Sequence, residues 1–201
     1  ILTPAHGVYV QGTLNITFRY YDANLQDAVL SVDSAKHDVT GRLFFSLNTK
    51  ALPDGVHKIS LNVTDKAGNS KEFSIDITID NTIPTVAITS PKEGGSLIGT
   101  IGIMFTAADA QTSLEKLILK IDSAVYDVTG KTLFSWDTST VGDGAHTIIL
   151  TATDKAGNTA STSITVVTVN VKTILMYVLI ITTLAFAASS VYFAKKKPKT
   201  S

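Results

Sequence analysis

Acidic and amide side chains recur at the predicted turns of this sequence, and they are the residue types that could hold a metal ion. Asp80, Asn81 and Asp109 lie at or near the junction between two repeated halves of the chain. Calcium takes about six to eight oxygen ligands, so the fold must bring residues distant in sequence to one point. Two interpretations stay open. These side chains only form turns, or calcium binds at the junction with Asp80, Asn81 and Asp109 as candidate ligands.

Two histidines, His57 and His146, occupy equivalent positions in the two halves, each two residues after an Asp-Gly pair. Neither has a second histidine at the spacing of zinc ligands. We therefore expect both to pack where a strand begins rather than to bind a metal.

The motifs of the common enzyme classes do not occur in this chain. There is no G-x-S-x-G, no HExxH, no phosphate-binding loop and no dinucleotide fingerprint. The chain has no cysteine, which excludes disulfides, thiolate metal sites and cysteine nucleophiles. We expect no catalytic residues, no enzyme activity and, calcium apart, no cofactor.

Charge is divided unevenly along the chain although its formal net value is zero. Residues 1–172 contain all 17 acidic residues and 13 of the 17 basic ones, so this body carries a net charge of −4. The other four basic residues lie in the last seven positions. A mildly acidic body is unlike a nucleic-acid-binding surface, and we expect no nucleic-acid partner.

Alternation of apolar and polar residues predicts strands with one buried face. The alternating runs are 14–20, 59–63 and 73–79 in the first half and 101–107, 117–121 and 148–152 in the second. Phe73 belongs to one of these runs and is expected on the buried face. Short strands separated by turn signals predict antiparallel β-sandwiches, so the fold class is all-β.

The chain repeats itself. Residues 32–69 match residues 121–158 at 21 of 38 positions, and the phrase Thr-Asp-Lys-Ala-Gly-Asn occurs at 64–69 and 153–158. Aspartate accepts hydrogen bonds from the backbone that follows it, and glycine adopts the positive φ of a tight turn. We interpret the phrase as the turn between the last two strands of each of two duplicated domains.

The phrases DGVHKISLNVTDKAGNS, DGAHTIILTATDKAGNT and DNTIPTVAITSP resemble the tandem immunoglobulin-like repeats of prokaryotic surface proteins. The resemblance covers about residues 1–170 and implies a fibronectin-III-like sandwich. It implies two such domains, at 1–82 and 83–170, in a stalk, an adhesin spacer or an accessory module. It identifies no function by itself, because such modules are attached to many proteins.

The two domains differ at their beginnings. The second opens with Ile-Pro-Thr-Val-Ala-Ile-Thr-Ser-Pro, whereas Ile1 aligns only with Ile88. The first domain is therefore expected to have an incomplete first strand. We infer that these residues are the C-terminal part of a larger protein.

Residues 173–194 contain no charged side chain. As a helix they would extend about 33 Å, enough to cross a hydrocarbon core of about 30 Å. Lys195, Lys196 and Lys197 follow directly, and by the positive-inside rule they anchor the basic tail, 195–201, in the cytoplasm. We expect a single membrane-spanning helix in the cell membrane, with the lipid bilayer as a partner and the body outside the cell.

Two Asn-x-Thr sequons, at Asn15 and Asn62, fall between inward-facing neighbours in predicted strands. On an exported chain they are candidate glycan acceptors, and chance occurrence in a threonine-rich sheet protein is the alternative.

The connections between domains and to the helix are short, and Pro84 restricts the first of them. We therefore expect a semi-rigid, membrane-anchored stalk of a surface layer or adhesin. It would hold upstream domains, or other surface proteins, away from the membrane. Two alternatives stay open: an extracellular adhesion or ligand-binding module for protein or glycan, and an accessory single-helix subunit of a membrane complex.

Overall fold

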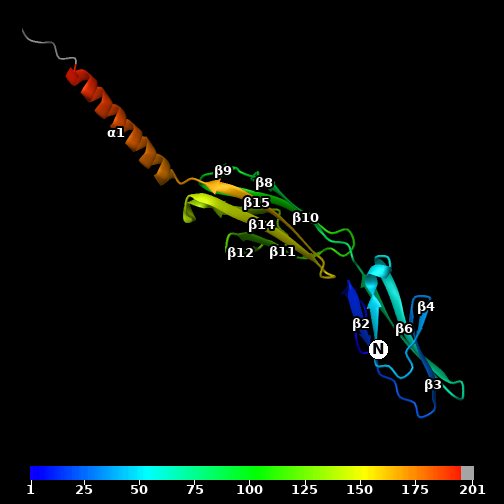
Figure 1. Ribbon diagram of the computed structural model, residues 1–201. Coiled ribbons are helices and arrows are strands. Elements are labelled where there is room, and N and C mark those ends of the chain that lie inside the picture. The colour runs from blue at the N-terminus through cyan, green and yellow to red at the C-terminus, as the bar shows by residue number, and fades with distance from the viewer. Residues whose placement is uncertain (196–201) are drawn as a thin grey trace, which may run out of the picture.

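The computed structural model describes residues 1–195 and contains two β-sandwiches followed by one helix (Figure 1). The first domain consists of β1 (Tyr9–Val10), β2 (Thr13–Thr17), β3 (Leu25–Val32), β4 (Ala35–Asp38), β5 (Phe44–Asn48), the 3₁₀ turn η1 (Thr49–Ala51), β6 (Gly55–Asp65) and β7 (Ser70–Ile79). The second consists of β8 (Thr85–Ser90), β9 (Ser96–Leu97), β10 (Thr100–Ala108), β11 (Leu114–Ile121), β12 (Ala124–Asp127), β13 (Leu133–Asp137), η2 (Thr138–Thr140), β14 (Gly144–Asp154) and β15 (Thr159–Thr168).

Each domain packs a five-stranded sheet against a smaller one. In the first domain the order β1-β7-β6-β3-β4 faces the pair β2-β5, and in the second the order β12-β11-β14-β15-β9 faces β13-β10-β8. The pairings are antiparallel except β1 with β7 and β9 with β15, which are parallel. The predicted all-β sandwiches are thus confirmed.

The cores follow the alternation seen in the sequence. Ile59 of the first domain and Ile148 of the second, equivalent positions in β6 and β14, are fully buried. Trp136 is 5% exposed and its counterpart Leu47 is 8% exposed, so a large and a small apolar side chain fill the same place. The two cores are separate clusters, one in each domain.

The repeated phrase forms the turn between the last two strands of each domain, as predicted. Oδ1 of Asp65 accepts hydrogen bonds from the backbone N–H groups of Ala67 and Asn69. Gly68 and Gly157 have φ of 89° and 92°, in the left-handed region that favours glycine. The turn is therefore a property of the local sequence.

The first domain has no counterpart of most of β8. In the second domain β8 pairs with the C-terminal half of β10 and packs against β14 and β15. In the first domain only Thr3 bridges to Thr17 at the equivalent place. Phe73, expected on the buried face, is instead 53% exposed, because its side chain lines a surface hollow beside β7 rather than the packed core.

The helix α1 (Val171–Lys195) begins two residues before the expected span. Residues 171–192 have a mean hydropathy of 2.2, long and apolar enough to cross a membrane, and none of them is buried against the domains. Lys195 ends the helix, whereas Lys196 and Lys197 lie outside the described residues.

Candidate functional site

Polar residues concentrate where the two domains meet. The first domain contributes Asp80, directly after β7. The second contributes the loop 109–113 between β10 and β11 and the turn 154–158 between β14 and β15. Figure 1 shows these loops at the end of the second domain that faces the first. We call this region the joint.

Hydrogen bonds across the joint hold Asp80 from two sides. The Thr112 hydroxyl donates to Oδ2 of Asp80 at 2.6 Å, and Nδ2 of Asn158 donates to its backbone oxygen at 2.8 Å. Asp80 is fully buried, and Thr112 and Asn158 are 5% and 8% exposed. Near them, Nζ of Lys155 lies 5.6 Å from the ring centroid of Tyr9, a cation–π contact between the domains.

Three carboxylates converge at the joint. One oxygen from each of Asp80, Asp109 and Asp154 lies within 4.8 Å of the other two, and Asp80 and Asp154 are fully buried. At this separation two ionised carboxylates repel by about 3 kcal/mol if the effective dielectric constant is about 20. The arrangement is therefore unfavourable unless something offsets the charge.

The turn 154–158 orients Asp154. Its Oδ1 accepts from the backbone N–H groups of Ala156 and Asn158, and its Oδ2 accepts from Nδ2 of Asn158. These donors satisfy the oxygens but carry no formal charge. The ion pairs in the described residues are His57 with Asp33 and His146 with Asp122, so none reaches the three carboxylates.

The sequence candidates for calcium separate in the structure. Asp80 and Asp109 meet at the joint, whereas Oδ1 of Asn81 accepts hydrogen bonds from the Gly12 N–H and the Thr49 hydroxyl inside the first domain. Asp154 was not among the candidate ligands. The repeated turn draws attention to Asp154 in the sequence. Only the packing of one domain on the other shows that Asp154 lies next to Asp80.

The first domain carries the equivalent of the second domain's half of the joint. Asp65 and Asn69 form the same turn as Asp154 and Asn158, with the same hydrogen bonds, and Asp22 corresponds to Asp109. No third carboxylate joins them among the described residues. Asp22 and Asn69 are exposed.

Comparison with known families identifies both halves. The family model described as "Bacterial Ig-like domain" matches residues 13–81, and the one described as "Bacterial Ig domain" matches residues 84–149. The chain is a tandem of two bacterial immunoglobulin-like domains. None of the curated proteins compared with it matches.

Solved structures agree with this fold. The fibronectin(III)-like modules of Clostridium thermocellum CbhA superpose with a TM-score of 0.54 at 16% identity, covering 85% of this chain and 93% of theirs. A tetra-tandem repeat in the extending region of a large adhesion protein gives 0.37 at 22% identity, covering 78% of this chain and 45% of that one. A Ca²⁺-stabilised adhesin of an Antarctic bacterium gives 0.37 at 18% identity, covering 80% and 45%. Scores of 0.37 are too low to argue from.

Both Ig-like domains contain a His–Asp pair that the sequence did not predict. Nδ1 of His57 lies 2.7 Å from Oδ2 of Asp33, and Nε2 lies 2.8 Å from the backbone oxygen of Pro53. In the second domain, Nδ1 of His146 lies 2.6 Å from Oδ2 of Asp122. The repetition of this aspartate at an offset of 89 was the available signal.

These contacts favour charged forms. Burial alone would lower the pKa of His57, but hydrogen bonds to Asp33 and Pro53 outweigh it and raise the pKa above 6.5. The hydrogen bond to Asp122 raises the pKa of His146. Conversely, the hydrogen bond from His146 lowers the pKa of Asp122. Each pair links a histidine near the start of β6 or β14 to the aspartate that follows β3 or β11.

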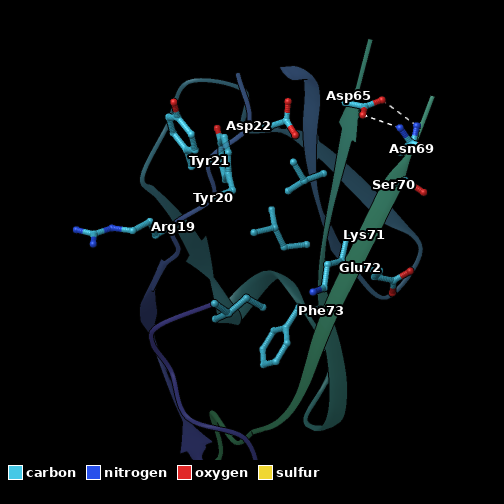
Figure 2. A pocket seen from close by; sticks show the side chains of 13 residues that line it. Arg19, Tyr20, Tyr21, Asp22, Asp65, Asn69, Ser70, Lys71, Glu72 and Phe73 are labelled. Carbon is cyan, nitrogen blue, oxygen red and sulfur yellow. Dashed lines mark hydrogen bonds between the residues drawn. The ribbon is translucent and has the colours of Figure 1, made fainter. Parts of the chain in front are cut away.

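A hollow of about 410 Å³ lies on the first Ig-like domain (Figure 2). Figure 2 shows it between the segment 19–22 and β7, with Phe73 at one end and the Asp65–Asn69 turn at the other. Tyr21 at its rim is 91% exposed. Phe73, which is 53% exposed, lines the hollow.

The two sequons lie in the first Ig-like domain. Asn15, in β2, is exposed, and Asn62, in β6, is half-buried. Their glycosylation stays a prediction that the intact mass of the native protein would test.

Proposed function

We propose that the chain is a membrane-anchored stalk of a cell-surface protein, of the surface-layer or adhesin type. It holds the part of the protein beyond its N-terminal domain away from the bilayer. The observation that supports it is a contact that both domains repeat. In each domain an aspartate, Asp54 or Asp143, binds the asparagine that begins the connection to the next unit. A stalk keeps its outer end at a defined distance from the membrane only if its joints do not bend freely.

The first fixing contact is at the end of the first Ig-like domain. The Asn81 N–H donates to Oδ1 of Asp54 at 2.8 Å, and the Thr82 hydroxyl donates to Oδ2 of Asp54 at 2.6 Å. Pro84, just before β8, is buried. Residues 80–82 and Pro84 are thus held by hydrogen bonds or burial, whereas Ile83 is 63% exposed.

The second fixing contact repeats the first at the membrane end. The Asn170 N–H donates to Oδ1 of Asp143 at 2.7 Å, and Nδ2 of Asn170 donates to the Val141 oxygen. Hydrogen bonds from Thr173 and Asn170 lower the pKa of Asp143, so its carboxylate stays charged at the N-terminus of α1, where negative charge is favourable. The start of α1 is therefore hydrogen-bonded to the second Ig-like domain.

The orientation is tested by cysteine labelling, because the chain has no native cysteine. Ser163 is exposed on β15. In intact cells a membrane-impermeant maleimide should label Ser163→Cys, and it should label Ser201→Cys only after permeabilisation. The reverse pattern would place the domains inside the cell and end the stalk proposal.

The spacer role is tested by deleting one domain between equivalent residues of the two repeats. Deleting residues 82–170 joins Asn81 to Val171 and recreates the junction that Asn170 makes in the full chain. The distance from a dye at the N-terminus to the bilayer surface, measured by energy transfer, should fall by about half. An unchanged distance would mean that the domains lie on the membrane.

A ligand-binding module is the second candidate, favoured by the exposed Tyr21 beside the hollow of the first Ig-like domain. Aromatic side chains at a recess are common in binding sites. Binding of surface proteins or glycans that is lost in Tyr21→Ala and kept after removal of the second domain would favour this candidate over the stalk.

A further inference from the structure

The joint between the two Ig-like domains has the geometry of a shared cation site. Two oxygens bound to one Ca²⁺ at about 2.4 Å are at most about 4.8 Å apart. The carboxylates of Asp80, Asp109 and Asp154 meet this limit, with one oxygen of each within 4.8 Å of the others. We propose that these three residues bind a calcium ion that links the first domain to the second.

A buried oxygen without a partner supports the site independently. Oδ2 of Asp109 is shielded from solvent and accepts no hydrogen bond; in residues 1–195 no other buried side-chain nitrogen or oxygen is left in this state. Oδ1 of the same carboxylate accepts from the backbone N–H groups of Gln111 and Thr112. A buried carboxylate oxygen with no partner is unfavourable, and coordination to a cation would satisfy it.

Charge balance points the same way. Asp80 and Asp154 are fully buried, and the ion pairs of the described residues do not include them. Buried carboxylates are normally paired with cations or coordinated to metals. A divalent ion would balance two of the three negative charges at the joint.

The ligand chemistry selects a hard cation. The cluster offers carboxylate oxygens only, which suit Ca²⁺ or Mg²⁺ rather than zinc. Ca²⁺ takes about six to eight oxygens in flexible geometry, whereas Mg²⁺ demands a near-ideal octahedron with shorter bonds. Three carboxylates contributed by two domains and three separate segments fit the more tolerant ion, with water completing its shell.

Such an ion would act on the connection between domains. Asp80 ends the first domain, and Asp109 and Asp154 belong to loops of the second, so all three bind the ion only when the domains are docked. Calcium would therefore stiffen the joint. The site depends only on the joint and does not require the proposed stalk function.

The first domain supplies a matched control. Asp22 corresponds to Asp109 and Asp65 to Asp154, with the same turn but without a third carboxylate in the described residues. Asp109→Asn removes the negative charge and one oxygen of a proposed ligand without changing its size, and Asp22→Asn makes the same change at the end of the first domain that lies away from the joint.

The experiment uses the full chain in detergent, freed of metal with EDTA and titrated with CaCl₂ by calorimetry. Wild-type protein should bind one Ca²⁺ with a dissociation constant of about 10⁻⁵ to 10⁻³ M, and its melting temperature should rise with calcium. Asp109→Asn should weaken binding by about tenfold or more and lose the calcium-dependent rise. Asp22→Asn should behave as wild type.

Three results would overturn the site: no heat and no rise in melting temperature at about 10 mM CaCl₂, equal binding by Asp109→Asn, or an equal response to MgCl₂. If Asp109→Asn does not fold, Asp80→Asn replaces it with the same expected loss.

Discussion

At the residue scale, one histidine in each Ig-like domain faces two acceptors at once. Nε2 of His146 lies 3.0 Å from the backbone oxygen of Gly142, and Nδ1 lies against the carboxylate of Asp122. His57 makes the equivalent pair of contacts. A carbonyl and a carboxylate both require a donor, and only the imidazolium form donates from both ring nitrogens. Each sandwich is therefore stabilised by a protonated histidine.

This stabilisation depends on pH. The folded pKa of His57 and His146 lies above the ordinary 6.5, so their contribution is complete below pH 6.5 and is lost as pH rises through the folded pKa. The pKa of Asp33 and Asp122 lies below 3.8, so their contribution is present above pH 3.8 and is lost as pH falls further. We expect the melting temperature to be highest between these two values and to fall from pH 6 to pH 9.

The control is a variant without the imidazoles. In His57→Gln/His146→Gln the melting temperature should be lower at pH 6 and nearly independent of pH above it. Thermal unfolding followed by circular dichroism, with the full chain in detergent, measures both. An unchanged slope in the double variant would mean that other groups cause the pH dependence.

At the element scale, the two domains differ in what pairs with the segment that leads into the loop after Asp22 or Asp109. In the second domain Ala107 pairs with Val86 and Phe105 pairs with Ile88. Ile1 is the equivalent of Ile88, so the residues equivalent to Val86 and Thr85 lie outside this sequence. The segment 19–22 forms no strand in this chain.

Extending this chain by residues equivalent to the first part of β8 should stabilise the first domain. We expect residues Ile-Pro-Thr-Val-Ala, copied from 83–87 and fused before Ile1, to pair with the segment 19–22 and fill the hollow beside Phe73. Burying one valine contributes about 1 kcal/mol or more, which raises the melting temperature of a domain of this size by about 4–8 °C. The same extension with serine in place of valine should give a smaller rise, and equal rises would show that no pairing occurs.

The elements were predictable from sequence because their causes are local. Period-two alternation placed the strands, the Asp-Lys-Ala-Gly-Asn turn supplied its own hydrogen bonds and positive φ, and an uncharged run gave the helix. Phe73 was misplaced because alternation shows which face of β7 a side chain lies on, but not whether another segment covers that part of the face. The meeting of Asp154 with Asp80 was likewise hidden, since 74 positions separate them and the repeat pattern describes each domain but not their contact.

At the scale of the whole molecule, the joint and the membrane-end contact decide whether the two Ig-like domains act as one body. Asp154 and Asn158 of the turn are buried at the joint, whereas Asp65 is half-buried and Asn69 exposed in the first domain. The contacts that hold Asp80 at the joint are two hydrogen bonds, from Thr112 and Asn158. Substituting Thr112 and Asn158, which donate these bonds, should therefore let the two domains move relative to each other without unfolding either.

This prediction can be measured as a distance between the domains. Ser46 and Ser135 are exposed, occupy equivalent positions 89 residues apart and can be changed to cysteine for spin labels, because the chain has no other cysteine. Pulsed electron resonance should give one narrow distance distribution. Thr112→Val with Asn158→Ala should broaden it, whereas Asn69→Ala, which removes the same turn bond at the uncovered end, should not. A broad distribution in the unmutated joint would show that the domains are connected flexibly, and a stalk built from them would then bend at residues 80–84.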